Sequence, residues 1–260
     1  MKKLLKIVIG IVVVFVVAVT VMFYLTSDMT DTAKKFFTAI KAKDYTTAYQ
    51  YLSEDFRAAT PQAEFTSFLE KSALLRFKDA SWSNRSISGG RGELDGSVTT
   101  ESGGVVPIKL GFIKENDKWL IYSIYKPQAG LAGGESGKLP SESEQVALVK
   151  ESIRKFALSV NAKDFTVFHK YTSHLWQREM TVQKFNEVFK PFLENNINLL
   201  PLDNLSPVFD GTSSIDDNGV LLIKGHYPTK PSKVLFELKY IYEGVSWKLV
   251  GTNINVKAAS

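Results

Sequence analysis

The chain has 260 residues, 44% of them hydrophobic, which is enough for two domains that each bury a core. It contains no cysteine, which excludes disulfide bonds, thiolate metal sites and a cysteine nucleophile. Of the net charge of +5, Lys2, Lys3 and Lys6 supply three charges, and the remaining +2 is spread among interspersed acids and bases. No basic stripe is left to follow a phosphate backbone, so no nucleic-acid partner is expected.

The segment 7–25, IVIGIVVVFVVAVTVMFYL, contains nineteen residues without a charge. At about 1.5 Å per residue, a helix of this length spans roughly the 30 Å hydrocarbon core of a bilayer. Val and Ile form helices poorly in water, but in lipid every backbone group must pair within the segment, which enforces the helix. The sequence therefore predicts a cytoplasmic stub and transmembrane anchor over residues 1–27, with the membrane as partner of residues 7–25.

The flanking charges predict the orientation of this anchor. The stub MKKLLK is positively charged, whereas the other flank opens with Thr26, Ser27 and Asp28. Positive flanks stay in the cytoplasm, so the bulk of the chain is expected in the periplasm or outside, held at the bacterial inner (cytoplasmic) membrane. A cleaved signal peptide is the alternative, but the apolar run is longer than the usual ~7–15 residues and no small-x-small cleavage site follows it.

Two stretches of the chain resemble each other. AKDY at 42–45 recurs as AKDF at 162–165, which places Asp44 and Asp164 120 residues apart. The same offset pairs further apolar positions: Phe36 with Phe156, Ile40 with Val160, Phe56 with Trp176, Phe65 with Phe185 and Leu69 with Phe189. Towards the end of each stretch, Trp119 and Trp247 align at an offset of 128. The second copy therefore carries about eight extra residues in its middle.

A segment rich in Gly and Ser separates the copies. It reads PQAGLAGGESGKLPSES from Pro127 to Ser143, a composition typical of a flexible linker. The sequence thus predicts a first domain over 28–126, a linker over 127–144 and a second domain over 145–260.

Each copy begins with helical periodicity. Apolar residues recur at helical spacing in a first helix of each copy: Ala33, Phe36, Phe37 and Ile40, then Ile153, Phe156, Ala157 and Val160. Asp44 and Asp164 follow a break and are predicted to cap a second helix. A third helix is predicted from a further set: Phe65, Phe68 and Leu69, then Phe185, Val188 and Phe189.

The period then changes from 3.6 to 2. Val106, Ile108, Leu110 and Phe112 alternate with other residues, and a similar alternation runs over 234–242. Turn signals divide the end of each copy into about four antiparallel strands: GGRG at 89–92, ESGG at 101–104, ENDK at 115–118, DDNG at 216–219, TKPS at 229–232 and EGVS at 243–246. We predict an α+β fold: a transmembrane helix, then two tandem ααα-ββββ cone domains with helices packed on a curved antiparallel sheet.

This order of elements, with the helix break KD[YF] and a Trp opening the last strand, resembles the nuclear transport factor 2-like (cystatin-like α+β cone) superfamily. It is most similar to the bacterial membrane-anchored extracytoplasmic domains of unknown function within it. The resemblance covers about residues 30–126 and 145–257. The superfamily contains enzymes, ligand carriers and assembly modules, so the resemblance implies a fold and leaves the function open.

Six aromatic residues are candidates for the interior wall of the two cones. They are Trp82, Phe112, Trp119, Phe236, Tyr240 and Trp247. In a cone with an open cavity they would contact a ligand, whereas in a filled cone they pack the core.

No catalytic residue, metal site or cofactor is predicted. The three histidines, His169, His174 and His226, lie in the second copy, and the first two are not at the i, i+4 spacing of a helical metal pair. Asp44 and Asp164 occur in both copies, but capping explains them and no acid, Tyr or His partner recurs with them. Enzymes such as ketosteroid isomerase place acid and base groups inside the cone, and no motif here matches those positions.

Three functions follow, in order of preference. The first is a non-enzymatic, membrane-anchored extracytoplasmic binding or assembly module whose partner is an envelope protein or a second copy of the chain. The alternative is a carrier of a small apolar or lipid-like ligand in the cone cavity. The third is an isomerase-like or dehydratase-like enzyme.

Overall fold

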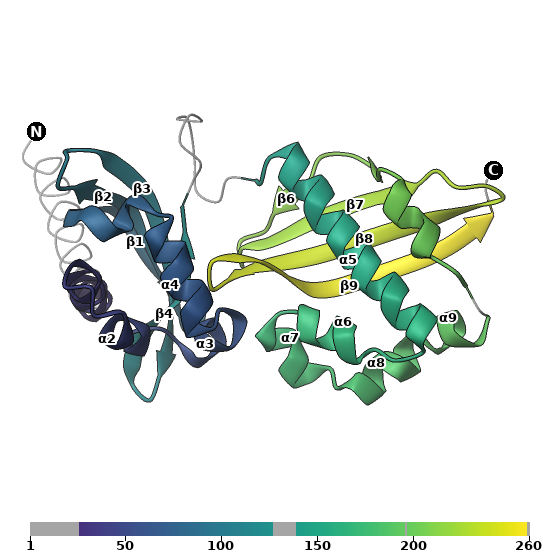
Figure 1. Cartoon of the computed structure of the whole chain (residues 1–260), viewed down its shortest axis with the longest axis horizontal. Coiled ribbons are helices and arrows are strands. Elements are labelled where there is room, and N and C mark those ends of the chain that lie inside the picture. The colour runs from purple at the N-terminus through teal and green to yellow at the C-terminus, as the bar shows by residue number, and fades with distance from the viewer. Residues whose placement is uncertain (1–25, 127–138, 196, 259–260) are drawn as a thin grey trace, which may run out of the picture. The chain divides into compact units, whose positions relative to one another are not determined.

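The computed structural model describes residues 26–126, 139–195 and 197–258. The chain divides into two compact units, Met1–Leu131 (unit 1) and Ala132–Ser260 (unit 2). Each unit combines helices with a curved antiparallel sheet, so the predicted α+β class is confirmed (Figure 1). In the part of the chain that the structure describes, no helix is both long and apolar enough to cross a membrane. The predicted anchor over 7–25 lies outside the described residues.

Unit 1 begins with helices. A helix described over 26–41 is followed by three short helices and a 3-10 turn: α2 Tyr45–Gln50, α3 Glu54–Ala59, α4 Gln62–Glu70 and η1 Ala73–Arg76. The first helix buries Phe36, Phe37 and Ile40 completely, as their helical spacing predicts. Lys43 then adopts a left-handed conformation (φ 59°), and Asp44 caps α2 by accepting a hydrogen bond from the Thr47 amide at 3.0 Å.

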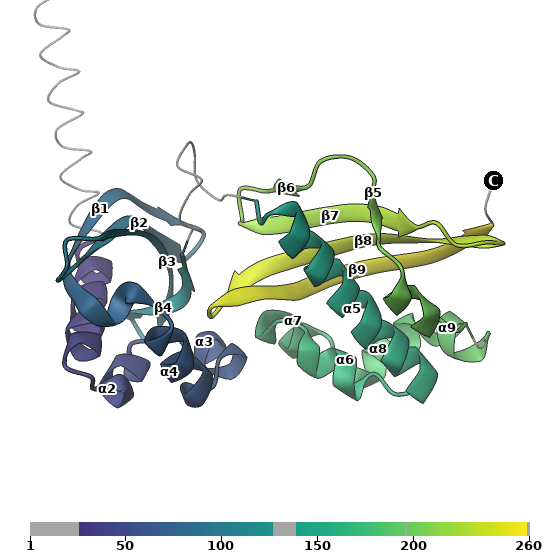
Figure 2. The ribbon, with the colours of Figure 1, turned by 45° about the horizontal axis from the view of Figure 1, so that its top comes forward.

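The sheet of unit 1 contains four strands in chain order, each antiparallel to the next: β1 Phe77–Ser88, β2 Arg91–Thr100, β3 Val105–Glu115 and β4 Lys118–Tyr125. They are separated at the turns that the sequence predicts. Leu94, Leu110 and Ile121 on the inner face are fully buried. Figure 2 shows the strands curling, with the helices on the concave side.

Unit 2 has a longer helical part. Its elements are α5 Glu142–Ala162, α6 Thr166–Tyr171, α7 His174–Glu179, α8 Val182–Val188, α9 Lys190–Glu194 and the 3-10 helix η2 Leu200–Asn204. α5 starts inside the predicted linker 127–144, because Ser141 and Glu144 form a capping box. The predicted linker end is therefore wrong by three residues, since α5 begins at Glu142. Figures 1 and 2 show α5 running along one face of the sheet.

The sheet of unit 2 has five strands rather than four. β7 Val220–Tyr227, β8 Ser232–Glu243 and β9 Ser246–Ala258 are joined by two short strands, β5 Val208–Phe209 and β6 Ser214–Ile215, which both pair with β7. β5 and β6 together hold the place next to β7 that β1 holds next to β2 in unit 1. Gly211, with a φ of 98°, breaks this edge into two pieces.

Two details of the predicted helices are wrong. Each unit has an additional helix, α3 or α7, between the predicted second and third helices. These six-residue helices escape a periodicity analysis because they are too short to show an apolar stripe. In addition, α6 begins one residue later than predicted and is preceded by Phe165. Asp164 instead accepts hydrogen bonds from the amide and hydroxyl of Thr166, at 2.9 and 2.7 Å.

Candidate functional site

The six candidate aromatic residues are distributed between both units. Phe112 on β3, with Phe236 and Tyr240 on β8, is almost fully buried in the cores. Trp119 on β4 is 8% exposed, whereas Trp82 on β1 and Trp247 on β9 are half-buried. Phe236, Tyr240 and Trp247 all belong to or pack against the core of unit 2. Of the six, Trp119 lines a hollow that is described below. Their role in ligand binding remains a prediction.

Tyr240 belongs to a buried hydrogen-bonded group inside unit 2. The Ser152 hydroxyl lies 2.9 Å from the Tyr171 hydroxyl and 2.9 Å from the Tyr240 hydroxyl. Burial raises the pKa of Tyr171 to about 12 and raises the pKa of Tyr240 well above its usual 10. Both phenols are therefore protonated at neutral pH, and the group serves as a satisfied polar contact between α5 and the sheet.

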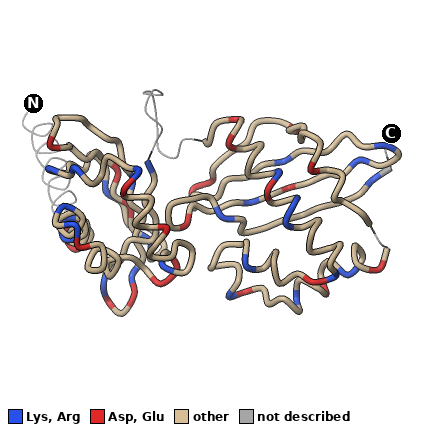
Figure 3. The backbone as a smooth tube through the Cα atoms, in the orientation of Figure 1, with Lys and Arg blue, Asp and Glu red and all other residues tan. Residues whose placement is uncertain are grey.

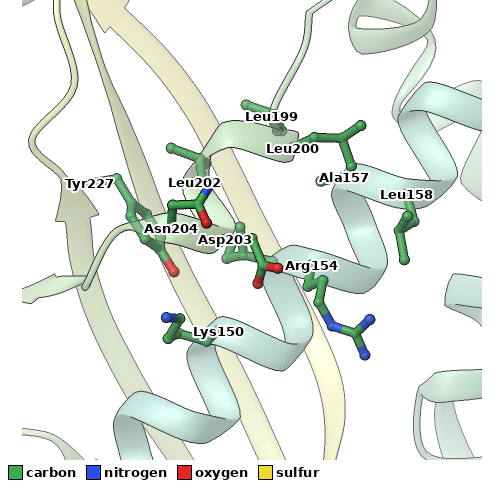
Figure 4. A pocket seen from close by; sticks show the side chains of 11 residues that line it. Lys150, Arg154, Ala157, Leu158, Leu199, Leu200, Leu202, Asp203, Asn204 and Tyr227 are labelled. Carbon is green, nitrogen blue, oxygen red and sulfur yellow. The ribbon is translucent and has the colours of Figure 1, made fainter.

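A pocket in unit 2 lies between α5 and η2, with a volume of about 240 Å³. Its apolar walls come from both elements and consist of Ile153, Ala157, Leu158, Leu199, Leu200 and Leu202. Its polar lining consists of Lys150, Arg154, Asp203, Asn204 and Tyr227. Figure 4 shows Leu158 and Leu200 on one side of the pocket and Lys150 and Tyr227 on the other. This pocket is the candidate site.

The charged groups beside the pocket are partly paired. Arg154 binds the Glu151 carboxylate through contacts of 2.8–3.0 Å, and this carboxylate raises the pKa of the Arg154 guanidinium. Asp203 adds a smaller electrostatic contribution in the same direction. Arg154 is thus a permanent, already bonded cation. Lys150, in contrast, forms no ion pair with any residue in the described part of the chain.

Tyr227 enters the pocket from β7. Burial, and then the nearby Asp203 carboxylate, raise the pKa of Tyr227 to about 12, so its hydroxyl stays protonated at neutral pH. The residue is 1% exposed, and among the described residues its hydroxyl has no hydrogen-bond partner. The hydroxyl is therefore a donor available to a ligand in the pocket.

This lining suits binding better than proton transfer. A general acid or base works best with a pKa near the working pH, whereas the Tyr227 and Arg154 pKa values are both raised from values that already lie far above neutrality. Within the described ranges, no three His, Asp or Glu side chains are grouped to hold a metal ion. The pocket instead combines apolar walls with a few polar groups, as small-molecule sites do.

Unit 1 has two further hollows, one of about 530 Å³ and one of about 340 Å³, on its first helix. They share Asp31, Lys35 and Tyr51, and most of their other lining residues are charged or polar. Trp119 lines the smaller one. Charged residues outnumber aliphatic ones in the lining of both hollows, whereas the α5–η2 pocket has six apolar lining residues and is the better candidate for retaining a small ligand.

One wall of the pocket, formed by η2, has no counterpart in unit 1. In unit 1 the chain passes from α4 to β1 through η1 alone, whereas in unit 2 the same connection contains α9 and η2. α9 lies about 120 residues after η1, so η2 is the additional element. The change of offset from 120 to 128 was the signal in the sequence for this insertion. It did not show that Lys150 and Tyr227, from distant segments, meet there.

The charges of both units are mixed. Figure 3 shows Lys and Arg alternating with Asp and Glu along the backbone of each unit. Two pairs join neighbouring strands, Lys109 with Glu93 and Lys224 with Glu237, each at 2.9 Å. As surface ion pairs, they contribute little to stability.

Comparisons with known proteins add little about function. Residues 25–130 are similar to a family described as a domain of unknown function, DUF4864. No curated protein matches the chain. Among solved structures, a cystatin-like protein from Ruminococcus gnavus ATCC 29149 is similar at 10% sequence identity and a TM-score of 0.29, over 93% of this chain and 95% of that one.

Proposed function

We propose that the chain is a membrane-anchored, extracytoplasmic binding protein without enzymatic activity, and that its second unit holds a small ligand in the α5–η2 pocket. The pocket carries this proposal, because about 240 Å³ of space between six apolar and five polar side chains provides both the burial and the orienting contacts that a ligand needs. The carrier alternative predicted from the sequence is thereby favoured over a purely assembling role.

The cellular location of the protein is proposed from the sequence. The apolar segment 7–25 supports a single crossing of the bacterial inner membrane, and the positive stub supports an N-terminus in the cytoplasm. Protease added to intact spheroplasts should then degrade everything beyond the anchor. A chain that stays whole until the spheroplasts are lysed would rule this location out.

We also propose that the two units are tandem copies of one nuclear transport factor 2-like cone. Equivalent hydrogen bonds support this relation. The Ser53 amide donates to the Ile121 carbonyl at 2.9 Å, and the Ser173 amide donates to the Leu249 carbonyl at 2.8 Å. The donors are 120 residues apart and the acceptors 128, which are the offsets of the sequence repeat.

The binding proposal is tested on the full-length chain in polymer-bounded native membrane discs. Molecules that co-purify with it are extracted and compared with those from Leu200→Trp, which fills the pocket, and from Leu205→Trp. Leu205 is 37% exposed and does not line the pocket, so its variant controls for the added indole. We expect one small molecule bound by the wild type and by the control, and lost from Leu200→Trp. The same profile from all three proteins would exclude the pocket as a ligand site, and a stoichiometric protein partner would favour an assembly role.

A further inference from the structure

The α5–η2 pocket has two chemically different ends. Lys150 and Leu158 are eight residues apart on α5, a distance of about 12 Å along a helix. Figure 4 shows the Lys150 amino group and the Tyr227 hydroxyl at one end, and Leu158, Leu199 and Leu200 away from them. A ligand that lies along α5 therefore meets polar groups at one end and apolar groups at the other.

The polar end offers hydrogen-bond donors that the protein does not use. The Lys150 ammonium, the Tyr227 hydroxyl and the Asn204 amide line the pocket. None of them has a side-chain hydrogen bond or ion pair within 26–126, 139–195 or 197–258. An ammonium is a pure donor, and a phenol whose pKa is raised to about 12 acts as a donor at neutral pH. Such a set matches the oxygen atoms of an anionic group.

The charge of the pocket points to a single negative charge on the ligand. Lys150 and Arg154 are positive and Asp203 is negative, so the lining has a net charge of +1. Outside the pocket, Arg154 is bonded to Glu151, which also pairs with Lys155 at 3.6 Å. The charges of Glu151 and Lys155 cancel, so the net charge of +1 does not change. Arg154 is bonded to Glu151, so among the lining residues the cation without an ion pair in the described part of the chain is Lys150.

We infer that the pocket binds a small amphiphile with one anionic head, such as a medium-chain carboxylate. The head would contact Lys150, Tyr227 and Asn204, and the alkyl chain would lie against Leu158, Leu199 and Leu200. This inference rests on the proposed function. A volume of about 240 Å³ exceeds the roughly 150 Å³ that accommodates benzene, and falls below the roughly 300 Å³ at which drug-sized sites begin. The ligand is thus smaller than a membrane phospholipid.

Asp203 is the group that argues against an anion, and it defines the competing ligand. A free carboxylate beside the pocket would attract the ammonium of a zwitterion or of an alkylamine. However, Asp203 lies close enough to influence both Arg154 and Tyr227, and it shares its field with these two donors. An anionic head at Lys150 leaves that arrangement intact, whereas an ammonium at Asp203 would be repelled by the Arg154 guanidinium, whose charge interacts with that of Asp203.

The test compares four probes with eight carbon atoms each: octanoate, 2-aminooctanoate, octanol and octylamine. Their binding to the full-length chain in lipid nanodiscs is measured by calorimetry, and the heat of partitioning into empty nanodiscs is subtracted. We expect octanoate to bind about ten-fold more tightly than the other three. Octanol and octylamine lack a carboxylate to accept a charge-assisted hydrogen bond from Lys150, and in 2-aminooctanoate the added ammonium repels the Lys150 ammonium.

Two variants locate the head. Lys150→Met should weaken octanoate about ten-fold and change octanol less than about two-fold, because only the charged head loses its partner. Lys257→Met removes the same charge from an exposed position on β9 that does not line the pocket, and it should leave both affinities unchanged. Circular dichroism confirms that both variants fold.

Other results overturn the inference in distinct ways. Preferential binding of 2-aminooctanoate or octylamine would assign the head to Asp203, and equal binding of octanoate and octanol would remove the anionic site. An effect of Lys257→Met as large as that of Lys150→Met would reduce the attraction to general charge. If no probe binds, although a co-purified molecule is lost from Leu200→Trp, the ligand class is wrong and the proposed function stands. If Leu200→Trp loses nothing, the proposed function itself fails.

Discussion

Units 1 and 2 share one type of hydrogen bond between a carboxylate and a helix amide, but its burial differs between the units. The Glu115 carboxylate accepts a hydrogen bond from the Glu54 amide at 3.0 Å, and the Glu243 carboxylate accepts one from the His174 amide, also at 3.0 Å. Each contact joins the last residue of the strand before the final one, β3 or β8, to the first residue of α3 or α7. Glu115 is half-buried, however, whereas Glu243 is 0% exposed. Equivalent geometry in the two units therefore does not mean equal energy, because the energy depends on what surrounds the contact.

The largest predicted difference in stability between the units arises at alkaline pH and is caused by their buried tyrosines. Burial raises the pKa of Tyr171 and of Tyr227 in unit 2 to about 12, from 10 in the unfolded chain. Between these two values the unfolded chain loses its protons first, so each tyrosine lowers the free energy of unfolding by up to about 1.4 kcal/mol per pH unit as the pH rises. Below pH 10 this contribution to stability is fully present.

Unit 1 provides the comparison for this effect. Among its described tyrosines, Tyr49 has a raised pKa, caused by burial and opposed by Arg57. We expect hydrogen exchange followed by mass spectrometry to show unit 2 opening before unit 1 as the pH is raised from 10 towards 12. Tyr240→Phe, which removes a third buried phenol, should shift the opening of unit 2 to higher pH. Simultaneous opening of both units would contradict this account.

The second largest predicted difference between the units comes from their aromatic cores. Phe156 on α5 contacts four phenylalanine rings, at centroid distances of 4.8–5.5 Å. Its equivalent, Phe36, contacts Phe37 at 5.1 Å and Phe65 at 6.1 Å. Both side chains are fully buried. Phe156→Ala should cost about 5 kcal/mol and Phe36→Ala about 3 kcal/mol, since each lost ring pair adds to the cavity cost.

Urea unfolding of the full chain, with each unit followed by its own exchange-protected amides, measures these losses. Leu158→Ala, at a position on α5 that is 40% exposed, serves as the matched control and should cost much less than Phe156→Ala. Equal costs for Phe156→Ala and Phe36→Ala would show that ring contacts add nothing beyond burial.

The third predicted difference concerns the carboxylates of Glu115 and Glu243. Glu243→Ala leaves the His174 amide without its acceptor in a buried position and should destabilise unit 2 by about 2–3 kcal/mol. Glu115→Ala exposes the Glu54 amide to water and should cost less than about 1 kcal/mol. Amide exchange in α7 and α3 reports each loss locally. Comparable protection factors in the two variants would mean that burial does not control the energy of this contact.

Local patterns predict much of this architecture. The spacing of Phe36 and Ile40 predicts a buried helix face, and the alternation around Leu110 predicts a strand, because each pattern follows from the geometry of one element. Turn residues such as those at 89–92 and 216–219 mark the ends of strands for the same reason. The two missed helices are too short for periodicity, and the linker end at 144 was missed because a capping box overrides the local composition.

The candidate site was not predictable in this way. Lys150 has the pattern of a solvated helix position, and Tyr227 is 77 residues away on a strand, so nothing local links them. The buried aromatic residues show a pattern that is visible in the sequence but does not distinguish a cavity wall from a packed core. Phe236 and Tyr240 alternate as a cavity wall would, but whether helices fill the opposing space depends on long-range packing. In the structure both belong to one buried core with phenylalanines of α5, α6 and α8.

The smallest predicted effect comes from two serines that are equally buried in units 1 and 2. Because burial is the same, any difference between them would have another cause. Ser53 and Ser173 cap α3 and α7, and each hydroxyl accepts a hydrogen bond from an amide at 3.1 Å. Both residues are 0% exposed. Replacing either by Ala should therefore cost about 1 kcal/mol and, unlike the glutamate pair, the same amount in both units. Unequal serine costs in the same exchange measurement would show that α3 and α7 differ in themselves, and burial would no longer explain the glutamate difference.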